Sequence, residues 1–385
     1  MKRILAAALG VLLLAALPLS AGAATLAEAG KSAVLMDVTT GTVLYEHNSH
    51  EALAPASVTK VMTMLLIMEA VDSGKISLAD TVTASEAAAA KGGSQIYLKA
   101  GETMRASDML KSIAVSSAND CACAMAEHIS GSESAFVEAM NQRAKELGMQ
   151  DTHFVNCTGL DDDDSARLHR TSAYDIALMS RELLKNHPDI KKYTTIWMDT
   201  VRNGTFGLSN TNKLIRFYPG ATGLKTGYTS GAGYCLSASA QKEGMELIAV
   251  VMGARTSQTR NAACKELLDY GFANFAVVTP EPEALPQVAV RLGKQAQVPA
   301  RMAESAGMLI EKSQRSGITT EISLKESVAA PVTRGQTLGS LAVKSGEQIL
   351  RQIPLVAAED VEKLTTGDIF LAVLRKAAMA KEGTE

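Results

Sequence analysis

The sequence predicts an α+β domain followed by a small all-β domain. Segments that alternate like strands lie near both ends of residues 24–278, and helical patterning fills the part between them. After a proline-rich stretch, short alternating runs resume. Because the strands come from distant parts of the chain, we expect one antiparallel sheet flanked by helices, which is the α+β arrangement. A chain of 385 residues is long enough for two or three domains.

The first segment, residues 1–23, has the composition of a secretory signal peptide. Lys2 and Arg3 precede an apolar run that ends at Pro18, and Ala21–Ala23 supplies the small residues of a cleavage site. The run is short for a membrane span, although an uncleaved anchor is the alternative. We expect an exported protein that works at the extracytoplasmic face of the membrane, in the cell wall or in the periplasm. Loss of the two basic residues changes the formal net charge from -3 to -5.

The elements of the first domain follow from hydrophobic period and from turn and cap residues. In chain order, we expect a hairpin over residues 33–47 that turns at 39–42, helices over 57–70, 107–130, 132–149 and 171–187, two strands over 223–254 joined by a turn at 243–244, and a helix over 260–275. Gly131 and Gly148 close the second and third helices, and Pro188 follows the fourth. From Val61 to Met68 the first helix is almost entirely apolar, which predicts burial on most sides.

Three prolines, Pro280, Pro282 and Pro286, mark residues 279–286 as a linker. Alternating runs over residues 287–364 predict the small β domain. Residues 365–385 form an amphipathic tail in which Phe370, Val373, Leu374 and Ala377 share one helical face, and Arg375, Lys376 and Lys381 add positive charge. Two interpretations remain open for this tail: peripheral contact with a membrane surface, or docking on the β domain.

Charge and metal-ligand patterns exclude other classes of function. The net charge of -3 and the lack of a basic stripe exclude nucleic-acid binding. His153 and His169 lack the spacing of a metal site with nearby carboxylates, so we expect no metal and no cofactor. The odd number of cysteines indicates small core residues, with a single disulfide left open: Cys121, Cys123, Cys157, Cys235 and Cys264.

Lys60 follows Ser57 by three residues at the start of the apolar helix, where both side chains lie on one face. A helix N-terminus stabilises an oxyanion, and a desolvated lysine loses its proton more easily, so that it can serve as a base. The pair therefore predicts a nucleophile and its base. A capping serine with a lysine that extends to the solvent is the alternative.

Two further motifs favour the catalytic interpretation. Ser117 and Asn119 form the only S-x-N, with a hydroxyl that can relay a proton and an amide that can hold a carbonyl; a helix cap is the alternative. Lys225, Thr226 and Gly227 form the only K-T-G, in which glycine on an edge strand lets a substrate backbone pair closely; a plain hairpin glycine is the alternative.

In the order S-x-x-K, S-x-N, K-T-G, these motifs resemble the signature of penicillin-recognising serine enzymes, with their transpeptidase/β-lactamase-like domain. From about Ala33 to the tail, the chain resembles the low-molecular-mass penicillin-binding proteins that are D-alanyl-D-alanine carboxypeptidases. Further matching stretches are MDVTTGTVLYEHN, FVNCTGL and VVMGARTSQTR. Tyr228 stands where some members carry histidine, and Cys157 where proline or alanine is common.

The resemblance implies a role for each matching residue. Ser57 would be acylated, Lys60 would be its base, and Ser117, with Asn119 in the same motif, would pass a proton to the leaving D-alanine. The remaining residues would bind substrate. Lys225, Thr226 and Gly227 would line the strand beside the substrate, and the backbone N–H groups of Tyr228 and Ser57 would form the oxyanion hole. Arg260 would bind the terminal carboxylate, although Arg255 lies nearby and could take this role instead.

The implied substrates are peptidoglycan stem peptides, and the implied inhibitors are β-lactams. No E-x-x-L-N motif, through which one class of β-lactamases releases its adduct, lies between Ser117 and Lys225, so we expect slow release. Residues 24–278 would then be a carboxypeptidase domain. A β-lactamase and a non-catalytic scaffold that binds the cell wall are the alternatives.

Overall fold

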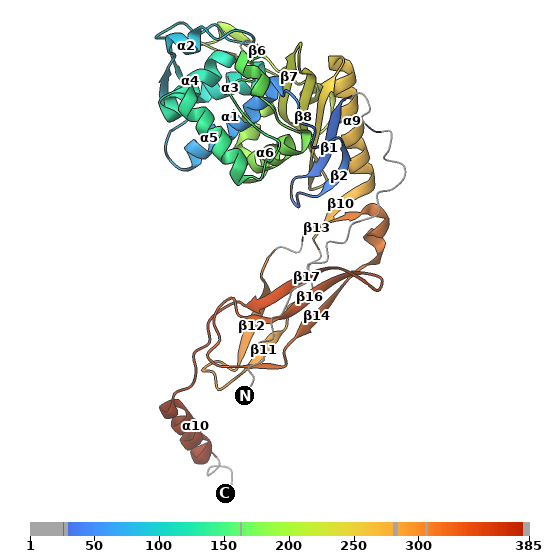
Figure 1. Ribbon diagram of the computed structural model, residues 1–385. Coiled ribbons are helices and arrows are strands. Elements are labelled where there is room, and N and C mark those ends of the chain that lie inside the picture. The colour runs from blue at the N-terminus through green and yellow to red at the C-terminus, as the bar shows by residue number, and fades with distance from the viewer. Residues whose placement is uncertain (1–25, 27–29, 162–163, 280–283, 305–306, 380–385) are drawn as a thin grey trace, which may run out of the picture.

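The computed structural model describes residue 26 and residues 30–161, 164–279, 284–304 and 307–379. The predicted signal peptide and half of the predicted linker, residues 280–283, lie outside these residues. Figure 1 shows the helical and sheet-containing domain at one end, the β domain beyond it, and the C-terminal helix at the opposite end.

The first domain is built on a five-stranded antiparallel sheet in the order β2-β1-β9-β8-β7. Its strands are β1 (Ser32–Asp37), β2 (Val43–His47), β7 (Ala221–Thr229), β8 (Gly233–Lys242) and β9 (Met245–Ala254). The β1–β2 hairpin was predicted, but the prediction of two strands over 223–254 is wrong, because three are present. The missed turn is short: the N–H of Ala232 donates to Thr229 Oγ1, and Gly233 has a φ of 69°. Because this turn consists of small residues, the alternating pattern of β7 and β8 appears in the sequence as one continuous strand.

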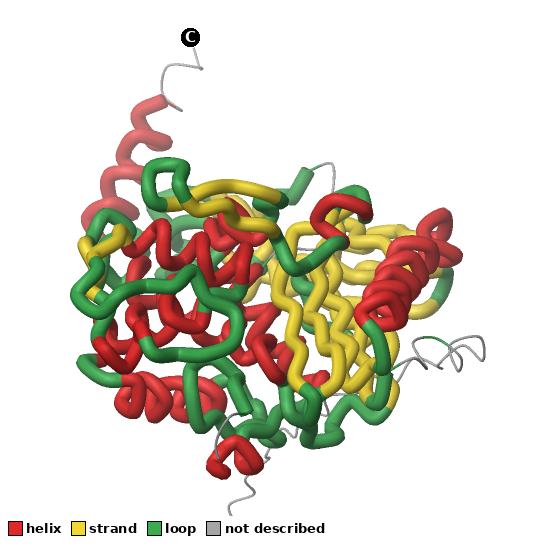
Figure 2. Tube along the Cα trace, turned by 90° about the horizontal axis from the view of Figure 1, so that it is seen from above, coloured by secondary structure: helices red, strands yellow, loops and turns green. Residues whose placement is uncertain are grey.

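The two faces of the sheet have separate cores, because successive side chains of a strand point to opposite sides. Val34 and Met36 contact the helical core, whereas Ala33 and Leu35 contact the core beneath α9 (Ser257–Asn274). Figure 2 shows the sheet between the large group of helices and α9. Helix α9 therefore packs back on the strands as predicted.

The long helices of the large group occur where helical period was found, but the helix expected over 107–130 is two helices, because the chain turns at Ser117 with a φ of 64°. The short helices and the small ribbons were not predicted. The members of the group are α1 (Lys60–Asp72), α2 (Glu86–Ala89), α3 (Ala106–Ser116), α4 (Asn119–Ser130), α5 (Glu133–Glu146), α6 (Ala173–Asn186) and α7 (Lys191–Thr194), with 3-10 turns η2 (Ala56–Thr59), η3 (Asp164–Leu168) and η4 (Pro188–Ile190) and two small ribbons, β3 (Thr81–Thr83) with β4 (Thr103–Arg105) and β5 (Met198–Val201) with β6 (Phe206–Ser209). The short helix α8 (Leu214–Phe217) contributes Leu214 to the core beneath α9. Every residue from Val61 to Met68 is buried, which confirms the prediction for this helix.

The β domain contains the predicted runs and two strands that the sequence did not reveal. Its strands are β11 (Gln287–Arg291), β12 (Gln297–Met302), β13 (Met308–Glu311), β14 (Ile318–Leu324), β15 (Ser327–Ala329), β16 (Thr337–Ser345) and β17 (Gln348–Ala357), and η5 spans Lys312–Gly317. Strand β12 was missed because Pro299 argues against a strand, and β15 because it has three residues. Strand β10 (Phe275–Val278) follows α9 and pairs with β13, so a two-stranded ribbon connects the domains.

Helix α10 (Thr366–Met379) confirms that the tail is helical. It stands apart from the β domain in Figure 1, so the docked alternative is wrong. The side chains of Ile369, Phe370, Leu371, Val373 and Leu374 are all exposed. Within the described residues, no helix has the length and apolar character needed to cross a membrane.

Candidate active site

Ser57 and Lys60 lie at the junction of η2 and α1. Ser57 belongs to the 3-10 turn, and Lys60 is the first residue of the α-helix. The Lys60 amine is 2.9 Å from Ser57 Oγ and donates to the carbonyl oxygen of Thr158 at 2.8 Å. The lysine is fully buried. The amine and the hydroxyl are therefore within direct proton-transfer distance.

Burial governs the charge of this amine. Removal from water lowers the pKa of Lys60 from 10.5 to about 7, and the negative potential of Cys157 and Asp120 only partly opposes this shift. Close to neutral pH a large fraction of Lys60 is therefore uncharged and can accept the proton of Ser57. This accounts for a lysine that is tolerated in so apolar a helix.

The carbonyl of Thr158 is positioned by a tight loop over residues 156–160. Asn156 Oδ1 accepts hydrogen bonds from the N–H groups of Thr158 and Gly159 at 3.2 and 2.7 Å, and its Nδ2 donates to the carbonyl of Leu160. Gly159 has a φ of 79°, and a Cβ there would lie 1.9 Å from the carbonyl oxygen of Ala56. Only glycine allows the loop to pass this close to the turn that carries Ser57.

The S-x-N motif forms the corner between α3 and α4. Ser117 ends α3 with a φ of 64°, and Asn119 begins α4. Asn119 Nδ2 donates to the carbonyl of Gly92 at 2.7 Å. Ser117 Oγ and Asn119 Oδ1 are buried and have no hydrogen-bond partner among the residues that the structure describes. Two buried polar atoms without a protein partner fit a surface that binds a polar ligand.

The K-T-G motif lies on β7, an edge strand of the sheet. A Cβ at Gly227 would lie 2.6 Å from the carbonyl oxygen of Pro55 and 3.1 Å from the backbone nitrogen of Ser57. The absence of a side chain at Gly227 therefore brings the strand against the nucleophile turn. Lys225 is buried, and its pKa is far below its usual value because of burial first, then the positive charges of Lys60 and Arg260.

A short chain of contacts joins the K-T-G strand to the S-x-N corner. Thr226 Oγ1 donates to Thr211 Oγ1 at 2.7 Å, and the N–H of Thr211 donates to the carbonyl of Val115 in α3, two residues before Ser117. Together with the close approach of Gly227 to Ser57, this places all three motifs around one site.

Tyr228 and Arg260 both contact Tyr234. Tyr228 is 56% exposed, and its ring centroid is 4.3 Å from that of Tyr234. Arg260 is buried on α9, with its guanidinium 5.9 Å from the centre of the Tyr234 ring and hydrogen-bonded to Asn261 Oδ1. Arg260 therefore lies behind the aromatic pair, in contact with the strand that follows the motif.

The family models match both parts of the chain. Residues 20–256 match the model of D-alanyl-D-alanine carboxypeptidases. The chain belongs to the D-alanyl-D-alanine carboxypeptidase family. Residues 280–363 match the model of the C-terminal domain of penicillin-binding protein 5. The predictions of the family, of a serine peptidase and of the fold class are confirmed by these matches and by the relatives below.

Individual members of the family are similar over most of their length. The D-alanyl-D-alanine carboxypeptidase DacF of Bacillus subtilis is 47% identical over 344 residues, which are 88% of this chain and 87% of that protein. The crystal structure of penicillin-binding protein 5 from Haemophilus influenzae has a TM-score of 0.75 at 30% identity and covers 87% of this chain and 98% of its own. Penicillin-binding protein D2 from Listeria monocytogenes, in its ampicillin-bound form, has a TM-score of 0.58 at 31% identity and covers 63% and 98%.

Of the two histidines considered as metal ligands, His169 has both ring nitrogens in contact with protein groups. His169 is buried, its Nδ1 accepts from the N–H of Val155 at 3.1 Å, and its Nε2 is 2.8 Å from Thr59 Oγ1. Burial lowers the pKa of His169 to about 3, so the ring is neutral and supports the nucleophile turn through Thr59. His153 pairs with Arg170 through the backbone.

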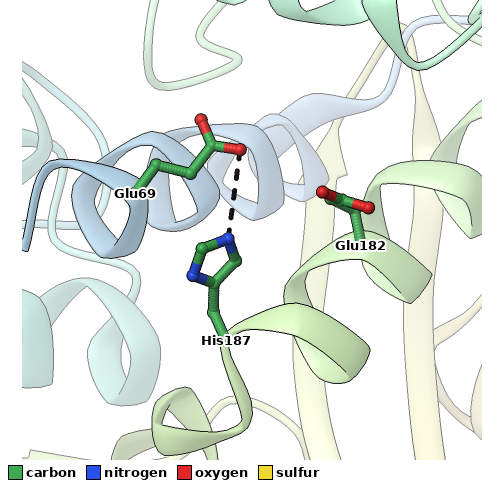
Figure 3. Close-up of side chains that lie close together, drawn as sticks. All are labelled: Glu69, Glu182 and His187. Atoms are coloured by element: carbon green, nitrogen blue, oxygen red, sulfur yellow. Dashed lines mark ion pairs between the residues drawn. The ribbon is translucent and has the colours of Figure 1, made fainter. Parts of the chain in front are cut away.

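Another group with metal-ligand chemistry lies outside the site. Glu69, Glu182 and His187 converge between α1 and α6, as Figure 3 shows. Arg143 of α5 lies among them: its Nε donates to Glu69 at 2.7 Å and its Nη2 to Glu182 at 2.6 Å. The arginine already supplies the positive charge that the two carboxylates require, so the group is an ion-pair network that joins three helices.

Two groups that complete the site were not predicted from the sequence. The Thr158 carbonyl holds Lys60, and Asn156 builds the loop that presents this carbonyl. Both lie in the stretch FVNCTGL, which carried the resemblance without an assigned role. The signal that could have indicated a tight functional loop is the pair of turn-forming residues Asn156 and Gly159, three residues apart between two helices.

Proposed function

We propose that this protein is a serine-type carboxypeptidase that removes the terminal D-alanine from peptidoglycan stem peptides through an acyl-enzyme on Ser57. The observation that carries the proposal is the buried Lys60 amine, 2.9 Å from Ser57 Oγ and with a pKa of about 7. A neutral amine at this distance removes the hydroxyl proton as the oxygen attacks the peptide carbonyl.

The other motif residues serve later parts of the reaction. The N–H groups of Ser57 and Tyr228 stabilise the oxyanion of the tetrahedral intermediate. Ser117 delivers a proton to the nitrogen of the leaving D-alanine, and Asn119 holds the substrate amide through the Oδ1 atom that has no protein partner in the described chain. Water then releases the shortened peptide, with Lys60 as its base.

The substrate lies along β7 and ends near the basic groups. An extended peptide adds to the edge of β7, where Gly227 removes the steric barrier. Lys225 and Thr226 line this edge, and the terminal carboxylate is attracted by the positive charge of Arg260, which contacts Tyr234.

β-Lactams acylate the same serine, and their adducts are released slowly. The related protein from Listeria monocytogenes was solved with ampicillin bound, which supports this class of inhibitor. The alternatives of a β-lactamase and a non-catalytic scaffold lack a supporting observation, since the chain carries every motif residue and lacks the E-x-x-L-N glutamate motif between Ser117 and Lys225.

Two measurements test the proposal. Wild-type protein should release D-alanine from a peptide that ends in D-Ala-D-Ala and should be labelled covalently by a fluorescent penicillin. Ser57→Ala should lose both, whereas Ser239→Ala, in the second S-x-x-K of the chain, should keep both. Labelling that persists in Ser57→Ala would rule out Ser57 as the nucleophile.

We also propose that the protein is exported and that α10 contacts the membrane surface peripherally. The proposal is supported by the basic residues of the tail and by the exposed apolar side chains of Ile369, Phe370, Leu371, Val373 and Leu374. Flotation with anionic liposomes tests it: the full chain should float, and a chain truncated after Thr366 should not. Equal flotation of both chains would contradict it.

A further inference from the structure

Two buried thiols meet beside the loop that holds Lys60. Cys123 lies on α4 and Cys157 on the loop, and neither is exposed to solvent. Cys157 Sγ lies 3.2 Å from Glu133 Oε1, and Cys123 Sγ lies 3.6 Å from Glu133 Oε2. The two thiols therefore share one carboxylate, and the neighbouring Cys123 thiol contributes to the raised pKa of Cys157. Both are free thiols, so the disulfide left open by the sequence is not formed in this structure.

The surroundings of this pair differ from those of an ordinary apolar core cysteine. Lys91 Nζ donates to Glu133 Oε2 at 2.6 Å, which keeps the Glu133 carboxylate charged although it lies against two thiols. This carboxylate can accept a proton from Cys157. By contrast, Cys264 contacts a backbone carbonyl within the core beneath α9.

Cys157 is connected directly to the catalytic amine. Its N–H donates to Glu133 Oε1 at 3.2 Å, and its carbonyl accepts from Thr63 Oγ1 at 2.6 Å. The next residue, Thr158, provides the carbonyl that holds Lys60 at 2.8 Å. Any displacement of Cys157 is therefore transmitted to Lys60 through one peptide unit.

We propose that Cys123 and Cys157 form a redox-active dithiol, and that the disulfide between them slows acylation of Ser57 by displacing the Thr158 carbonyl from the Lys60 amine. The second half of this inference depends on the proposed function, whereas the formation of the disulfide does not. The site is a modification site for a peroxide, a small oxidant that can reach a buried sulfur.

The reaction with hydrogen peroxide balances within the cluster. Cys157 passes its proton to Glu133, and the thiolate attacks one peroxide oxygen, so that the O–O bond breaks and the second oxygen leaves as water with that proton. The resulting sulfenic acid is attacked by the Cys123 sulfur. The S–O bond breaks, the S–S bond forms, and a second water leaves with the Cys123 proton. Two thiols lose two electrons, and one peroxide is reduced to two waters.

The geometry sets the size of the effect. A disulfide requires the two sulfurs to approach to about 2.05 Å, which is shorter than their contacts of 3.2 and 3.6 Å with Glu133, so the two segments must shift toward each other. A misplacement of about 1 Å at a catalytic group costs about 100-fold in rate, and rotation of the two side chains absorbs part of the change. We therefore expect acylation to slow by roughly three- to tenfold. The neighbouring Cys123 thiol, burial and the Glu133 carboxylate all raise the pKa of Cys157, so the oxidation is slow at neutral pH.

The experiment compares the reduced and peroxide-treated full-length chain. Peptide mapping by mass spectrometry should find Cys123 linked to Cys157, and labelling by fluorescent penicillin should slow by the expected factor and recover after dithiothreitol. Cys123→Ser cannot form the bridge and should keep its labelling rate after the same treatment, which controls for oxidation of methionine. Cys264→Ser should respond like the wild type.

Each outcome has a defined meaning. Absence of the linked peptide, or a bridge that leaves the labelling rate unchanged, would overturn the inference. Slowing of Cys123→Ser to the same extent as the wild type would overturn it as well, because the effect would then come from another residue. If the reduced wild-type protein is not labelled at all, the proposed function fails, and peptide mapping still tests whether the two cysteines join.

Discussion

Replacement of Lys60 by methionine should abolish acylation and make the protein more stable, by an amount that depends on pH. Lys60→Met keeps an unbranched chain of similar length but removes the amine from its buried position. The shift in the pKa of Lys60 from 10.5 to about 7 lowers the free energy of unfolding by about 5 kcal/mol. The full cost applies at a pH where Lys60 is protonated in both the folded and the unfolded protein. This cost applies fully below pH 7 and disappears as the pH rises through 10.5.

The balance with lost hydrogen bonds gives the expected values. The variant leaves Ser57 Oγ and the Thr158 carbonyl without the amine, at a cost of about 1 kcal/mol each. At pH 6 almost the whole lysine penalty applies, so Lys60→Met should gain about 3 kcal/mol in free energy of unfolding. At pH 9 only about 2 kcal/mol of the penalty remains, and the net gain should be close to zero. The difference between the two pH values, about 3 kcal/mol, is independent of the hydrogen-bond terms.

Urea unfolding at pH 6 and pH 9 measures this difference. Trp197, the single tryptophan, lies in the catalytic domain between α7 and β5 and reports the unfolding of that domain by fluorescence. Lys192→Met is the matched control, because Lys192 is exposed and its stability effect should not change between the two pH values. A gain for Lys60→Met that is equal at pH 6 and pH 9 would refute the argument that burial shifts the pKa of this amine.

Three further predictions concern the same site. The rate of acylation by penicillin should rise about tenfold per pH unit below pH 7 and level off above it, since Lys60 acts only when neutral; a stopped-flow profile without a bend near pH 7 would contradict this. Asn156→Ala should slow acylation at least about tenfold, whereas Asn156→Asp, which keeps the two accepted hydrogen bonds, should recover most of the rate in the same labelling assay. Gly227→Ala should push β7 away from the nucleophile turn and reduce the rate of labelling by more than about tenfold. Gly207→Ala is the control, because a Cβ at Gly207 meets nothing within 4 Å and should leave the rate unchanged. Equal rates for the two variants would show that the close approach of Gly227 is unnecessary.

The parts of the site that could be predicted are those expressed as side-chain types at fixed spacing. Ser57 and Lys60 are three residues apart at a helix start, and the structure brings their polar atoms into contact. The Thr158 carbonyl could not be predicted, because every residue has such a carbonyl and only the fold decides which one faces the amine. Arg260 illustrates an intermediate case: its residue type suits a carboxylate, but its position behind Tyr234 depends on how α9 packs on the sheet.

The same distinction applies to the fold. The long periodic helices and the first hairpin were predicted because their apolar pattern extends over many residues. The turn at 230–232 and strand β12 were not, because each depends on a local exception: a turn of small residues within an alternating run in the first case, and a proline accepted within a strand in the second. Whether such a turn or proline is accepted depends on how the strand pairs with distant segments of the chain, and a single sequence does not show this pairing.

The central position of β9 has a consequence for when activity can arise. In the sheet this strand lies between β1, from the beginning of the domain, and β8, which leads to β7. The turn of Ser57 and the strand of Lys225 therefore belong to two halves that are joined only after residues 245–254 are available. A chain that ends before residue 245 contains Ser57, Lys60 and Lys225, yet it should remain inert toward penicillin.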